Sequence, residues 1–158
     1  MITPTNKETI PMQAVVKLMG LALASTLALP AFAQMTPVGT WHSIDDKTGE
    51  VKSEVRLVEA NGAVSGKVEK LLRKGADQSA RCIDCDGDRK DQPVIGLEII
   101  RGARKASGKD VWEDGRILDP ENGREYRLRL TPIEGGKRLE VRGSFGPIWR
   151  TQTWVRVQ

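Results

Sequence analysis

Cys82 and Cys85 are the only cysteines in the chain and stand three positions apart. Such a pair can form a disulfide, a thioredoxin-like redox site or half of a zinc site. The aspartates around Cys85 oppose both a helix start and a stabilised thiolate, and Asp86 stands where covalent haem attachment needs a histidine. A zinc site needs four ligands, but His42 is the single histidine. We expect a disulfide in an oxidising compartment, with the redox and metal alternatives open.

Three aspartates alternate through the same segment and offer oxygen ligands of the kind that calcium prefers. They are Asp84, Asp86 and Asp88. A helix–loop–helix calcium site requires Gly at its sixth position and Glu at its twelfth. Counted from Asp84, these positions hold Arg89 and Ile95. The count favours a solvated, turn-rich loop, and we predict no metal site.

Groups for catalysis are sparse. His42 follows Trp41 in an apolar–polar run, and no motif supplies a serine or aspartate to complete a triad. No nucleophile elbow of the G-x-S-x-G type and no phosphate-binding glycine loop is present. Paired carboxylates for glycoside chemistry stay open, because their pairing is spatial. We therefore predict no catalytic residue, no cofactor and no enzyme.

A secretory signal is expected over residues 1–33. Lys17 precedes an apolar run at 18–29, and Ala31 and Ala33 supply small residues for signal peptidase. The run is shorter than the roughly 20 residues that span a bilayer. We predict cleavage after Ala33, no transmembrane anchor afterwards, and a periplasmic or secreted protein. Met12 is an alternative start to Met1.

The predicted mature part, residues 34–158, suits a single domain with one modest core. After Lys7, Lys17 and Glu8 leave with the signal, its net charge is +3. The charges are interleaved with apolar residues instead of gathered in a basic stripe, so we expect no nucleic-acid partner.

Apolar and charged residues alternate with period two through most of this part. Tyr126, Leu128 and Leu130, for example, alternate with arginines. The expected strands are 38–44, 51–59, 63–72, 94–101, 110–118, 124–132, 137–143 and 150–157. Eight antiparallel strands joined by short turns predict an all-β, up-and-down β-barrel, with a β-sandwich as the alternative.

Two connections carry more information than the others. Asn61-Gly62 lies between alternating runs and is typical of a two-residue hairpin. Residues 73–93 are far longer than a hairpin loop needs, and they contain both cysteines. This segment is therefore the one most in need of a functional or structural explanation.

Several segments, taken in order, resemble a bacterial exported family named domain of unknown function 2147. They are Gly39–Trp41, Asp45–Gly49, Cys82–Gly96, Ile117–Tyr126, Leu139–Gly143 and Arg150–Arg156. The resemblance covers nearly all of residues 38–157. It implies a periplasmic or secreted location and a lipocalin-like barrel, and it implies no activity.

A lipocalin-like barrel also implies a closure between its first and last strands. Gly39 and Trp41 would form the G-x-W of the first strand, with Arg156 over the indole ring. A ligand role for Trp41 and Arg156 is the alternative. Arg156 shares a strand face with Trp154, and Val155 lies on the other; the sequence leaves open which face is interior.

Two function hypotheses follow. The first is a small apolar ligand held inside the barrel, since eight strands leave room for side chains or for one small molecule. Its candidate lining residues are Val55, Leu57, Val68, Leu97, Ile99, Tyr126, Leu128 and Val141. The second is a ligand-free interaction or structural module of the cell envelope. It would present to an envelope protein the cysteine loop, the Phe145–Trp149 loop, or the row Arg127, Arg129, Arg138 and Arg142.

Overall fold

The computed structural model describes residues 35–157. The expected signal at residues 1–33 and the expected mature start at Gln34 lie outside the described residues. None of the helical segments within residues 35–157 is long and apolar enough to cross a membrane.

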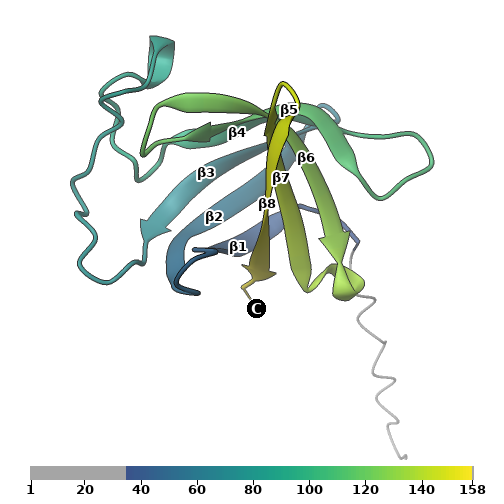
Figure 1. Cartoon of the computed structure of the whole chain (residues 1–158). Helices are drawn as coiled ribbons and strands as arrows, with labels where there is room; N and C mark the ends of the chain where they lie inside the picture. Colours follow the sequence, from purple (N-terminus) through teal and green to yellow (C-terminus); the bar gives the residue numbers. More distant parts are fainter. Residues whose placement is uncertain (1–34, 158) are drawn as a thin grey trace, which may run out of the picture. The chain divides into compact units, whose positions relative to one another are not determined.

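Eight antiparallel strands close into a barrel in which each strand pairs with its sequence neighbours and β8 pairs with β1 (Figure 1). The strands are β1 (Gly39–Ile44), β2 (Val51–Ala60), β3 (Ala63–Leu71), β4 (Glu98–Lys105), β5 (Trp112–Asp119), β6 (Arg124–Ile133), β7 (Arg138–Phe145) and β8 (Ile148–Arg156). Short 3-10 helices lie at η1 (Gly87–Arg89) and η2 (Glu134–Gly136). The predicted barrel is confirmed, and the sandwich alternative is wrong.

The barrel has two distinct ends because the chain reverses at every strand. The connections β1–β2, β5–β6 and β7–β8 and the long β3–β4 connection meet at one end, called here the open end. The connections β2–β3, β4–β5 and β6–β7 meet at the other, the closed end, beside residues 36–38. In Figure 1 the β7–β8 hairpin rises to the top, while β8 runs down toward the C-terminus.

Turn chemistry explains the tightest connections. Asn61 and Gly62 both have positive φ, at 54° and 71°, which is the conformation of a type I′ hairpin turn. Gly146, with φ of 57°, precedes Pro147 in a two-residue turn between the paired residues Phe145 and Ile148. The expectation of a loop at Phe145–Trp149 is therefore wrong, because β7 and β8 continue into this segment and form a tight hairpin.

The fourth strand begins at Glu98, four residues later than the predicted 94–101. Val94 and Leu97 are buried, but they belong to the end of the long connection. The register of β3 with β4 skips Ile99, so that Ile99 and Ile100 are both buried. A bulge of this kind breaks the period-two pattern from which the strand was predicted.

The best-packed core lies toward the closed end. Its largest fully buried apolar side chains are Trp41, Leu57, Ile100, Leu130, Leu139, Val55 and Val64. Each such side chain contributes roughly 1.5–3 kcal/mol by leaving water. The packing is close: a Cβ at Gly66 would stand 2.4 Å from a Leu57 methyl carbon.

Candidate functional site

A cavity of about 710 Å³ occupies the open end of the barrel. Four of the predicted lining residues, Val68, Ile99, Tyr126 and Val141, contribute to its wall. Further apolar wall residues, absent from that prediction, are Leu71, Ile117, Leu118 and Trp154. The site is thus a concave pocket with mainly apolar walls, in the position where eight-stranded barrels hold small ligands.

The other four predicted lining residues lie outside this cavity. Val55, Leu57, Leu97 and Leu128 are buried in the packed core instead, with at most 4% of their surface exposed. For the strand residues Val55, Leu57 and Leu128 the reason is depth, because alternation identifies residues that face inward but not whether they lie in the filled half or the hollow half. Leu97 lies in the β3–β4 connection and not on a strand. The indole of Trp41 is also fully buried in the filled half.

Polar groups interrupt the apolar wall at a few places. The Ser43 and Ser53 hydroxyls lie 2.7 Å apart, across β1 and β2. The Trp154 indole N–H lies 3.4 Å from the Gln152 side-chain oxygen. A small number of fixed polar groups in an apolar pocket orients a ligand that has one polar end.

The structure shows which face of β8 points into the barrel, a question that the sequence did not decide. Gln152 and Trp154 line the cavity, and Arg156 follows on the same face toward the closed end. Val155 is 39% exposed on the opposite face. The sequence shows that Gln152, Trp154 and Arg156 lie on one face of the strand, because they are two positions apart. It does not show whether that face points inward or outward.

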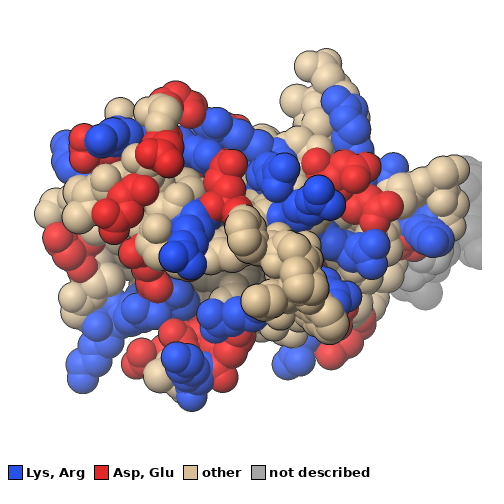
Figure 2. All heavy atoms as spheres, turned by 45° about the horizontal axis from the view of Figure 1, so that its top comes forward, with Lys and Arg blue, Asp and Glu red and all other residues tan. Residues whose placement is uncertain are grey.

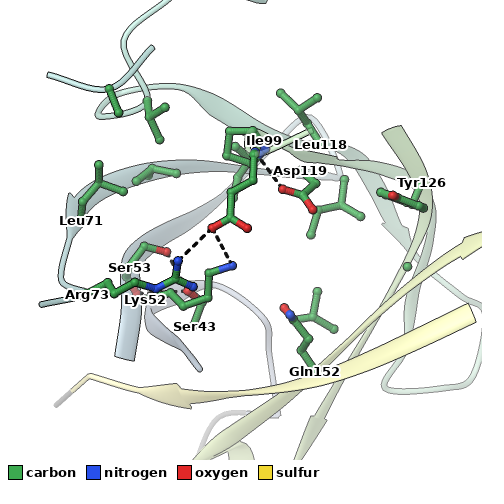
Figure 3. Close-up of a pocket in the computed structure, with 18 of the residues that line it drawn as sticks. Ser43, Lys52, Ser53, Leu71, Arg73, Ile99, Leu118, Asp119, Tyr126 and Gln152 are labelled. Atoms are coloured by element: carbon green, nitrogen blue, oxygen red, sulfur yellow. Dashed lines mark hydrogen bonds and ion pairs between the residues drawn. The ribbon is translucent and has the colours of Figure 1, made fainter. Parts of the chain in front are cut away.

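Charged side chains bridge the mouth of the cavity (Figure 3). The Glu121 carboxylate, in the β5–β6 turn, lies 3.1 Å from Lys52 Nζ and 3.4 Å from an Arg73 guanidinium nitrogen. Arg73 also pairs with Asp45 at 3.0 Å. Each of these exposed ion pairs contributes at most about 1 kcal/mol to stability. They therefore hold the segments around the mouth only weakly.

The closed end is held by Trp41 and Arg156. The Arg156 guanidinium lies over the Trp41 ring, 4.1 Å from its centre, and donates hydrogen bonds to the carbonyl oxygens of Gly136, Val38 and Thr36. The Trp41 indole N–H donates to the Pro37 carbonyl at 2.8 Å.

Gly39 completes this arrangement. Its φ is 138°, and a Cβ there would stand 2.3 Å from an Arg156 nitrogen. Only glycine leaves room for the guanidinium beside this strand. Burial lowers the pKa of Arg156, yet its carbonyl partners and the ring face are all suited to a cation.

The two cysteines of the long connection are joined by a disulfide and fully buried. Cys82 Sγ lies 3.5 Å from the Pro120 carbonyl oxygen. A Cβ at Gly123 would collide with the Asp84 backbone. The disulfide-bonded part of the long connection therefore packs against the β5–β6 turn, beside the cavity mouth.

Ion pairs fasten the same connection to the barrel wall. Arg89 pairs with Glu125 of β6, and Arg101 of β4 pairs with Asp88 at 2.6 Å. Both pairs are long-range contacts that no sequence motif indicated. Arg101 lowers the pKa of Asp88 by its hydrogen bonds, so this carboxylate serves as an anchor.

The lone histidine lies on the strand face opposite Trp41, outside the cavity. Its Nε2 atom is 3.2 Å from a Glu54 carboxylate oxygen, and Glu54 also binds Lys70 at 2.7 Å. Within residues 35–157, no group of three histidine, cysteine, aspartate or glutamate side chains is placed to hold a metal ion.

Comparison with known proteins agrees with this geometry. A solved structure titled "Protein HP1028 from the human pathogen Helicobacter pylori belongs to the lipocalin family" is similar in fold, with a TM-score of 0.65 and 18% identity over 77% of this chain and 82% of that chain. No curated protein shows significant sequence similarity. Residues 39–156 match a family described as "Uncharacterized protein conserved in bacteria (DUF2147)". The chain therefore belongs to this bacterial family, with a lipocalin-like barrel as its fold.

Proposed function

We propose that the protein is exported and binds one small, mainly apolar ligand in the cavity at the open end. The single observation that carries this proposal is the cavity itself. Its volume of about 710 Å³ falls inside the range of roughly 300–1,000 Å³ that small-molecule sites occupy. The similarity to a lipocalin-family structure supports the fold but does not identify a ligand.

The wall chemistry narrows the class of ligand. Ile99, Ile117, Val141 and Trp154 offer an apolar surface. The uncharged polar side chains in the wall include Ser43, Ser53 and Gln152. The charged groups, including Lys52, stand at the mouth. This distribution suits an amphiphile whose apolar part enters the barrel while its polar end stays near the mouth.

The export part of the proposal rests on two observations. The sequence over residues 1–33 has the order of a secretory signal, and a buried disulfide is stable in an oxidising compartment. Mass spectrometry of the protein recovered from the producing bacterium tests it. A chain that starts at Gln34 supports export, and an intact N-terminus in the cytoplasm refutes it.

Native mass spectrometry tests ligand binding. We expect the protein recovered from cells to carry a bound small molecule that organic extraction removes. A panel of fatty acids should then raise the melting temperature of the extracted protein. A bare mass, together with an unchanged melting temperature across the panel, would refute the proposal.

A filling substitution ties the binding to this cavity. Ile117→Trp projects a larger side chain into the hollow half and should abolish the ligand-dependent shift in melting temperature. Val155→Trp is the matched control, because Val155 points to the outside. Equal ligand shifts in both variants would place the ligand elsewhere.

A further inference from the structure

The hairpin between β7 and β8 exposes three large apolar side chains at the rim of the cavity. Phe145, Ile148 and Trp149 are 72%, 73% and 61% exposed. Leaving them in water forgoes the free energy that burial would bring, roughly 1.5–3 kcal/mol each. The two-residue turn at Gly146 and Pro147 holds them at the end of a tight hairpin, so they project as a rigid tip.

Arginines without acidic partners lie beside this tip. On the outer face, Arg116 of β5 stands directly opposite Arg127 of β6. Arg142 of β7 stands opposite Arg129 and lies over the Trp149 ring, 4.6 Å from its centre. Among residues 35–157, Arg116, Arg127 and Arg142 form no ion pair, whereas Arg129 pairs with Glu113.

This arrangement costs stability in the isolated protein. Like charges directly opposite each other on neighbouring strands are destabilising. Four other arginines near the open end, Arg73, Arg89, Arg101 and Arg150, each bind a carboxylate. An external anion would relieve the repulsion among the unpaired arginines. Guanidinium groups suit phosphate oxygens in particular, which they bind through two parallel hydrogen bonds.

Apolar tip and basic face occur together on one side of the molecule. Figure 2 shows an uncharged ridge next to a hollow, with lysine and arginine side chains around them and acidic side chains in between. Aromatic and apolar side chains next to cations match the boundary between lipid headgroups and acyl chains. A stable protein interface uses roughly 800 Å² of surface on each partner, whereas the apolar residues here are three side chains at the end of one tight hairpin.

We propose that the open end docks on an anionic lipid surface. Phe145, Ile148 and Trp149 insert at the boundary of the acyl chains, and Arg116, Arg127 and Arg142 bind lipid phosphates. The cavity mouth then faces the membrane, because the tip residues also line the rim. A ligand with an acyl chain could pass between bilayer and barrel without crossing water.

Vesicle co-sedimentation tests the docking. Vesicles of phosphatidylcholine alone are compared with vesicles that contain 30 mol% phosphatidylglycerol. The N-terminus is read by mass spectrometry first, so that a retained signal is not mistaken for the hairpin. We expect binding to the anionic vesicles, weaker binding to the neutral ones, and loss of binding as salt rises, because salt screens the phosphate contacts.

Two sets of variants locate the contact. The triple change of Arg116, Arg127 and Arg142 to Gln should lower partitioning on the order of 100-fold, from about fivefold per charge near an anionic surface. Its control changes Arg104, Lys109 and Lys137 to Gln, which removes the same charge at the closed end and should change partitioning no more than about twofold.

The tip variants change Phe145, Ile148 and Trp149 to Ser, with Val58→Ser and Val155→Ser as exposed apolar controls elsewhere. We expect the tip variant to lose binding and the controls to keep it. In the unmodified protein, brominated acyl chains should quench Trp149 fluorescence, and Trp149→Phe should remove that quenching. Far-ultraviolet circular dichroism checks that each variant is folded.

Other results would overturn the docking. These are no binding to either vesicle, equal loss in the target and control variants, or a concentration-dependent dimer in place of vesicle binding. The inference is independent of the cavity ligand. A protein that binds vesicles but carries no small molecule would keep this inference and refute the proposed function.

Discussion

The two ends of this barrel are held together by different kinds of contact. The closed end is held by buried groups: the Trp41 ring, the Arg156 guanidinium above it and three backbone carbonyls. The open end is held by exposed ion pairs and one disulfide around a hollow. Buried contacts contribute far more free energy than exposed pairs. The closed end therefore supplies more of the stability of the barrel than the open end, where we propose that a ligand binds.

The pair of tryptophans offers the sharpest test of this difference. Trp41→Ala should lower the free energy of unfolding by about 3–5 kcal/mol, because it leaves a cavity in the core and removes the ring below Arg156. Trp149→Ala, at the open end, should lower it by no more than about 1 kcal/mol. Urea unfolding measures both. Similar losses in the two variants would break the comparison.

Glycine substitutions repeat the test at the level of the backbone. Gly39→Ala should cost about 2–4 kcal/mol, from a strained φ and the collision with Arg156. Gly146→Ala also places a side chain at positive φ, but it meets open space and should cost about 1 kcal/mol. The difference between the two unfolding free energies combines the collision with the greater backbone strain at the φ of 138° of Gly39 than at the φ of 57° of Gly146. If the two substitutions cost the same free energy, the placement of the Arg156 guanidinium does not require a residue without a Cβ at position 39.

Sequence reasoning reached the closed end better than the open end. Gly39, Trp41 and Arg156 form a recognisable set, and strand alternation predicted the barrel that the structure contains. Both signals are local or motif-based. The closure geometry needs only that the first and last strands pair, which any closed meander provides.

The open end escaped prediction for physical reasons. Alternation cannot separate Val68, in the cavity wall, from Val55, in the filled core. The bulge at Ile99 shifted the expected strand by four residues. Contacts such as Arg89 with Glu125 join segments far apart in sequence, and charge alone does not say which partners meet.

Removing the disulfide tests whether the open end can unfold locally while the closed end stays folded. Replacing Cys82 and Cys85 by Ala should cost about 2 kcal/mol, since the bridge closes only a short loop. We expect hydrogen exchange to rise in residues 73–97, while the amides of β1 and β8 stay protected. Reduction of the unmodified protein is the companion experiment and should give the same exchange pattern. Loss of protection across the whole barrel would show that the ends are not independent.

Acid should loosen the open end first, and this is the smallest effect expected. Hydrogen bonds from the Lys47 and Thr48 amides lower the pKa of Asp45, and those from Arg101 lower the pKa of Asp88. A carboxylate with a lowered folded-state pKa contributes stability above its unfolded pKa of about 3.9. That contribution is lost as pH falls through the folded-state value.

The contacts of the Arg156 guanidinium at the closed end do not change in this range, because that group stays protonated far above it. The pKa of Glu54 is lowered by hydrogen bonds with Lys70 and His42, so in β1 the comparison uses the amides of residues 39–41, on the far side of His42 from the open end. Between pH 5 and pH 2.5, hydrogen exchange corrected for intrinsic rates should therefore accelerate in residues 45–50 and 86–91 before it does in β1 and β8. Asp45→Asn and Asp88→Asn should flatten the acceleration in their own segments, since the neutral side chains no longer titrate. Acid-induced opening that begins at β1 and β8 would mean that the closed end, with its buried cation, is the weaker of the two.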